Sequence, residues 1–174
     1  MSEPLRDTLI RQLDTAWALA TYHLDGLSDG ECLWRPADEG LHIWADGQGG
    51  WRPDWPDHEG YDLGPPSIGW TTWHLLYWWS MALDRNFGPG ILAREDVRWP
   101  GNAEALRRCL HDLNVAWRGR LGAIGDAELV APRTSSWPRA DQSLADVFAW
   151  ANIELTKNAA ELGYARFLFA IRKV

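Results

Sequence analysis

The stretch that decides the fold is residues 143–171, SLADVFAWANIELTKNAAELGYARFLFAI. Apolar residues recur in it at steps of three and four, which is the repeat of one face of an α-helix. Ser143 precedes this stripe and is a favourable helix cap. The pattern predicts a long helix over 143–171 in which one stripe position, Asn158, is polar. The apolar stripe consists of Leu144, Phe148, Ala151, Leu155, Leu162, Ala165 and Phe169.

Three further stretches carry a helical repeat, and they predict helices near residues 3–27, 67–87 and 102–123. The second is apolar on nearly every side, so we expect it to be the most buried. No strong strand signal lies between these helices apart from one short segment. The sequence therefore predicts an all-α four-helix bundle that forms a single domain over residues 1–174.

Residues 28–66 have a different character, because glycine and proline are dense and no helical repeat survives. Within them, residues 41–44 and 51–52 flank Asp46-Gly47-Gln48-Gly49-Gly50, which predicts a small β-hairpin. Eight of the 13 tryptophans fall between Trp34 and Trp79. This long Trp/Gly/Pro-rich segment predicts a crossover between the first two helices and a lid or wall over a pocket.

Composition excludes several classes of function. The chain has 24 acidic and 17 basic residues and a formal charge of −7, so it offers no basic stripe for nucleic acid. No apolar run approaches the roughly 20 residues that span a bilayer, and we expect a cytoplasmic protein. Two cysteines cannot build a cysteine-rich zinc site, and the common hydrolase, kinase and dehydrogenase motifs are absent.

Polar residues near the apolar stripes are the candidates for a functional site. His74 lies in a run of aromatic and aliphatic residues, where a buried imidazole needs a partner. Glu154, Asn158 and Glu161 share one face of the last helix, at i, i+4 and i+7. These residues suit either a divalent metal site or a metal-free hydrogen-bond network in which Glu154 accepts from His74.

Three segments resemble the DinB-like superfamily: Trp34-Arg35-Pro36, Pro66-Ser67-Ile68-Gly69-Trp70 leading to His74, and residues 152–163, NIELTKNAAELG. The resemblance implies a four-helix bundle that holds a divalent metal, often zinc or nickel. It implies His74, Glu154 and Asn158 as the ligand positions. Relatives usually carry histidine where this chain has Asn158, and an amide oxygen is a weaker donor than imidazole.

The resemblance also implies chemistry on a small molecule. Some relatives use a low-molecular-weight thiol, such as mycothiol or bacillithiol, in transferase or isomerase reactions. The leading hypothesis is therefore a metal-dependent enzyme of the thiol-transfer or hydrolase type that acts on a small, partly apolar molecule. One alternative is a metal-free protein that binds such a ligand between its tryptophans, and another is a structural bundle that forms a homodimer.

Overall fold

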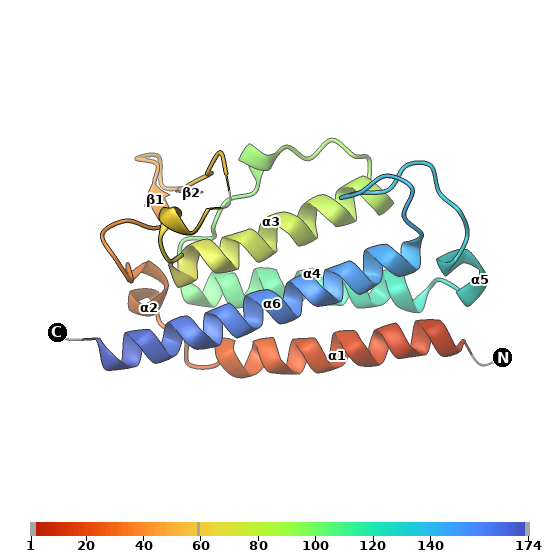
Figure 1. Cartoon of the computed structure of the whole chain (residues 1–174), viewed down its shortest axis with the longest axis horizontal. Coiled ribbons are helices and arrows are strands. Elements are labelled where there is room, and N and C mark those ends of the chain that lie inside the picture. Colours follow the sequence, from red (N-terminus) through yellow and green to blue (C-terminus); the bar gives the residue numbers. More distant parts are fainter. Residues whose placement is uncertain (1–2, 59, 173–174) are drawn as a thin grey trace.

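The computed structural model describes residues 3–58 and 60–172 and is mostly helical, as the sequence predicts. Its four long helices lie along one another (Figure 1). They are α1 (Pro4–Leu24), α3 (Ile68–Phe87), α4 (Ala103–Gly122) and α6 (Leu144–Ile171). Each helix begins and ends within about three residues of its predicted bounds. None of the described helices is long and apolar enough to cross a membrane.

Side-chain caps begin three of these helices. Ser67, Asn102 and Ser143 each accept a hydrogen bond from the backbone N–H three residues ahead. Such a bond satisfies one of the amide groups that a helix leaves unpaired at its start. The caps therefore fix the starts of α3, α4 and α6.

A short helix that the sequence analysis missed, α2 (Asp29–Leu33), follows α1 directly. The first helix stops at Leu24 because the chain turns at Gly26, whose φ is +63°. Ser28 and Glu31 then form a reciprocal capping box that starts α2. This signal, a serine followed three residues later by a glutamate, is visible in the sequence.

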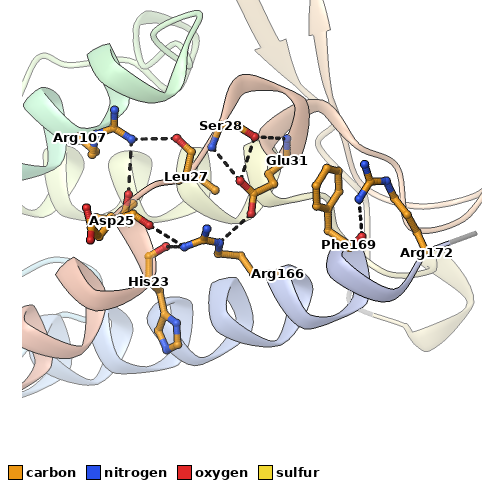
Figure 2. Close-up of polar contacts among 10 residues, drawn as sticks. His23, Asp25, Leu27, Ser28, Glu31, Arg107, Arg166, Phe169 and Arg172 are labelled. Carbon is orange, nitrogen blue, oxygen red and sulfur yellow. Dashed lines mark hydrogen bonds and ion pairs between the residues drawn. The ribbon is translucent and has the colours of Figure 1, made fainter. Parts of the chain in front are cut away.

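Arg166 of α6 connects the end of α1 with α2 through hydrogen bonds (Figure 2). Arg166 donates to the carbonyls of His23 and Asp25 and to Glu31 Oε1, at 2.8–2.9 Å. The last carbonyls of a helix have no partner within the helix, so Arg166 supplies one for the end of α1. Arg107 of α4 does the same for the carbonyl of Leu27.

The predicted hairpin is confirmed, with β1 (Ile43–Ala45) antiparallel to β2 (Trp51–Pro53). Asp46 begins the turn, and its Oδ1 accepts from the backbone N–H groups of Gln48 and Gly50, both at 2.8 Å. The hairpin packs against the first half of α3 (Figure 1). It therefore stands beside the helix that carries His74.

The direction of the helices corrects one prediction. Contacts at one end of the molecule join the end of α1 and the short helix α2 that follows it with the starts of α3 and α4 and with the end of α6. Therefore α1 and α6 run parallel, and α3 and α4 run opposite to them (Figure 1). The segment between α1 and α3 joins neighbouring ends and is not a crossover.

The connection that returns along the molecule is instead residues 88–102, between α3 and α4. The indole of Trp73 donates to the carbonyl of Val97 at 2.7 Å, and that of Trp99 donates to Thr72 Oγ1 at 3.2 Å. These bonds hold the connection against α3. It contains the 3₁₀ turn η2 (Arg94–Asp96); the other short elements are η1 (Tyr61–Leu63) and α5 (Asp126–Leu129).

Candidate functional site

His74 and Asn158 meet between α3 and α6, which pack against each other. The Nδ1 atom of His74 lies 3.2 Å from Oδ1 of Asn158. Asn158 occupies a position on the buried stripe of α6 and is only 3% exposed. The polar position that interrupts the apolar stripe in the sequence therefore faces the histidine of the neighbouring helix.

Trp78 decides which nitrogen of His74 carries the proton. Its indole N–H, which can only donate, points to His74 Nε2 at 2.7 Å. Nε2 must therefore be the unprotonated nitrogen, and the proton of the neutral ring is on Nδ1. His74 then donates to Asn158, and both of its nitrogens are used.

The network continues from Asn158 to Glu154, one turn earlier on α6. The amide nitrogen of Asn158 donates to the backbone carbonyl of Glu154 at 2.8 Å and to its carboxylate Oε2 at 3.2 Å. The chain of bonds thus runs Trp78, His74, Asn158, Glu154, with each group donating to the next. The sequence analysis missed Trp78, although its spacing of four from His74 places both on one face of α3.

Burial lowers the pKa of His74 to about 4. The largest cause is the loss of hydration, which penalises the charged ring, and the ammonium of Lys157 adds to it. The hydrogen bond with Asn158 acts in the opposite direction and is weaker. His74 is therefore neutral at physiological pH.

A pocket of about 840 Å³ opens beside this network. His74, Glu154 and Lys157 contribute polar side chains to its wall, while residues 55–58 and 60–66 contribute much of the rest. The expectation that the segment between the first two long helices forms a pocket wall is thus met. Its aromatic lining residues are Trp55, Tyr61, Trp70, Tyr77 and Trp78.

The ring of Trp70 stacks on the imidazole of His74, with centroids 5.0 Å apart and planes 25° apart. The indole N–H of Trp70 donates to the carbonyl of Asp54 at 2.8 Å, which ties the ring to the segment after the hairpin. His74 is thus held by a stacked ring on one face and by hydrogen bonds at both nitrogens.

Comparison with protein-family models assigns the sequence to a known family. The model described as the DinB superfamily matches residues 12–162, which include His74, Glu154 and Asn158. The chain belongs to the DinB superfamily. Comparisons with curated proteins and with solved structures gave no match.

The donor set of this DinB superfamily member does not fit a tightly held zinc or nickel ion. A catalytic zinc site has three protein ligands. Here the third candidate ligand beside His74 and Glu154 is the amide of Asn158, which is a weak donor. The lone pair of His74 Nε2 is directed at the indole N–H of Trp78. Among the described residues, no group of three His, Cys, Asp or Glu side chains could hold a metal ion.

The remaining histidines lie outside this network. His42 does not line the pocket: it is 3% exposed, and neither ring nitrogen has a hydrogen-bond partner among the described residues. His58 lies on the pocket rim, 3.9 Å from Asp62. His23 packs its ring against Gly163 of α6, and His111 contacts Trp17.

Proposed function

We propose that this chain binds a small, partly aromatic or apolar molecule in the pocket between α3, α6 and residues 55–58 and 60–66, and that it does so without a metal at His74. The observation that carries the proposal is the use of both His74 nitrogens by Trp78 and Asn158. We interpret the four long helices as a bundle of the DinB-like type in a cytoplasmic protein.

The composition of the pocket supports ligand binding. Ligand sites in proteins are typically cavities of about 300–1,000 Å³, lined mainly by apolar and aromatic side chains with a few fixed polar groups. This pocket has about 840 Å³ and five aromatic lining residues. His74, Asn158 and Glu154 hold one another in place, so the polar groups are positioned before a ligand arrives.

The test compares two tryptophans of similar exposure, one inside the pocket and one outside it. Trp55 lines the pocket and is 44% exposed, while Trp44 lies outside it and is 46% exposed. Each ring has an arginine guanidinium over it, Arg94 at 4.6 Å and Arg35 at 5.0 Å. Trp55→Leu should weaken binding of the neutral dye N-phenyl-1-naphthylamine at least about fivefold, whereas Trp44→Leu should leave it unchanged.

Fluorescence titration in the presence and absence of a strong chelator measures both effects. Equal affinity with and without chelator is expected. Loss of binding on chelation would contradict a metal-free site, and equal loss in the two tryptophan variants would contradict the location.

A metal-dependent enzyme, of the thiol-transfer or hydrolase type with zinc or nickel and a low-molecular-weight thiol, stays a prediction. Membership of the DinB superfamily and the meeting of His74, Asn158 and Glu154 favour it. Such an enzyme requires that the hydrogen bond from Trp78 to His74 Nε2 break, so that Nε2 can bind the metal. It also requires a metal ligand stronger than the Asn158 amide beside Glu154.

This requirement is testable by restoring the missing donor. The double variant Asn158→His with Trp78→Phe should bind zinc at least about 100-fold more tightly than the parent, because it adds an imidazole and frees Nε2. Competition with a chromophoric chelator measures the affinity, and adding His74→Ala should abolish the gain. A parent protein that binds zinc as tightly as the double variant would refute the metal-free proposal.

A further inference from the structure

Three aromatic rings form an angled wall in the pocket. Trp55 and Tyr77 have centroids 5.3 Å apart and planes inclined by 73°. Tyr77 and Trp78 follow at 5.1 Å and 67°. A flat ligand stacks on one ring at a time, whereas a rounded group touches several inclined rings together. The wall therefore favours a ligand group that is not flat.

The charges around the pocket favour a cation. The carboxylates of Asp57 and Glu154 are in its lining. Lys157 also lines it, but its ammonium lies 3.2 Å from Glu161 Oε1, so this charge is partly neutralised. His74 contributes no positive charge, because its Nε2 accepts a hydrogen bond from the indole N–H of Trp78 and is therefore unprotonated.

The chain itself places a cation against this wall. Arg94, which is not in the pocket lining, sets its guanidinium 4.6 Å from the centre of the Trp55 ring. Its charge is partly neutralised by Glu95, whose Oε1 lies 2.6 Å away, so Arg94 does not offset the two carboxylates of the lining. The negative faces of aromatic rings attract cations in this way, and cages of such rings recognise quaternary ammonium groups.

We propose that the ligand is an organic cation with a methylated ammonium group, held by Trp55, Tyr77 and Trp78 and attracted by Glu154. This inference rests on the proposed function and names the ligand class of the same pocket. A primary ammonium is strongly hydrated and needs several acceptors, whereas a trimethylammonium group needs ring faces and a nearby negative charge. The volume of about 840 Å³ leaves room for an organic body behind this group.

Two compounds of the same shape test the role of charge. Calorimetric titration would compare (4-hydroxyphenyl)trimethylammonium with its neutral isostere 4-tert-butylphenol. The cation should bind at least about tenfold more tightly, since cation–π contacts at a desolvated site are of that size. Glu154→Gln should reduce affinity for the cation about threefold or more and leave the neutral compound unchanged. Trp44→Leu serves as the control with unaltered binding.

The outcomes separate this inference from the proposed function. Equal or tighter binding of 4-tert-butylphenol would overturn the cation inference and leave the apolar pocket standing. If neither compound nor N-phenyl-1-naphthylamine binds, both proposals are overturned. Preference for the cation that Trp55→Leu does not reduce would also overturn the inference, because the cation would then bind elsewhere.

Discussion

At the scale of single residues, the chemistry of the site depends on a neutral imidazole. His74 has a pKa of about 4 in the folded chain and an ordinary value of 6.5. The unfolded chain therefore takes up a proton on this ring as pH falls below 6.5, while the folded chain resists it down to about 4. This difference lowers stability over that range of pH.

The resulting loss is measurable. Between pH 7.5 and 4.5, His74 should lower the free energy of unfolding by about 2 to 3 kcal/mol. Urea unfolding of the parent and of His74→Gln at both pH values isolates this contribution, because the other titrating groups are common to both proteins. The parent should lose more stability than the variant, and equal losses would contradict a His74 that stays neutral in the folded chain.

The sequence predicts part of this site for physical reasons. A polar residue on an otherwise apolar helical stripe needs a buried partner, and this argument leads from Asn158 to His74. The role of Trp78 does not follow in the same way, since an indole in a tryptophan-rich helix has many ways to pack. Only the fold shows that its N–H reaches Nε2 of His74.

At the scale of elements, the four long helices follow from apolar stripes and capping residues, which are local signals. The path of residues 88–102 back along the molecule cannot be predicted from local signals, because it depends on contacts such as that of Trp73 with Val97, 24 residues apart. Nor does the sequence show where the hairpin docks. That position depends on Gly69, which lets the side chain of Ile43 and the carbonyl of Cys32 approach α3 closely.

Two helical glycines test this docking. A Cβ at Gly69 would lie 2.4 Å from Ile43 Cδ1 and 2.8 Å from the carbonyl oxygen of Cys32, whereas one at Gly119 of α4 meets nothing within 4 Å. Gly119→Ala should stabilise the protein by about 0.5 to 1 kcal/mol through helix propensity. Gly69→Ala should destabilise it by about 1 to 3 kcal/mol despite the same gain.

Thermal or urea unfolding measures both changes, and hydrogen exchange in residues 43–53 should speed up in the Gly69 variant. A Gly69→Ala protein as stable as the Gly119→Ala protein would show that α3 and the hairpin are not packed this closely.

At the scale of the whole molecule, the last two turns of α6 carry apolar residues on their exposed side as well as on their buried one. Tyr164, Phe167 and Ile171 are 67%, 71% and 78% exposed and recur at steps of three and four. A contiguous apolar row on a surface helix is typical of an interface. We predict that two copies of the chain pair through this face of α6 in a symmetric dimer.

Sedimentation over about 1 to 100 µM measures this assembly. Phe167→Lys should convert the dimer into a monomer, because it places a charge in the paired apolar row. Val130→Lys, at another exposed apolar residue that lies outside α6 (58% exposed), should leave the dimer intact. A parent protein that is monomeric at every concentration would exclude the pairing.

The order of donors in the network from Trp78 to Glu154 has an optical consequence. All of its hydrogen bonds point the same way, from an indole to a carboxylate, and bonds in such a chain polarise one another. A positive charge that settles beside Glu154 draws electron density away from Asn158 and His74 and so weakens the acceptor that Trp78 faces. The emission wavelength of an indole depends on the hydrogen bond of its N–H. A ligand that binds near Glu154 of α6 should therefore shift the fluorescence emission of Trp78 on α3.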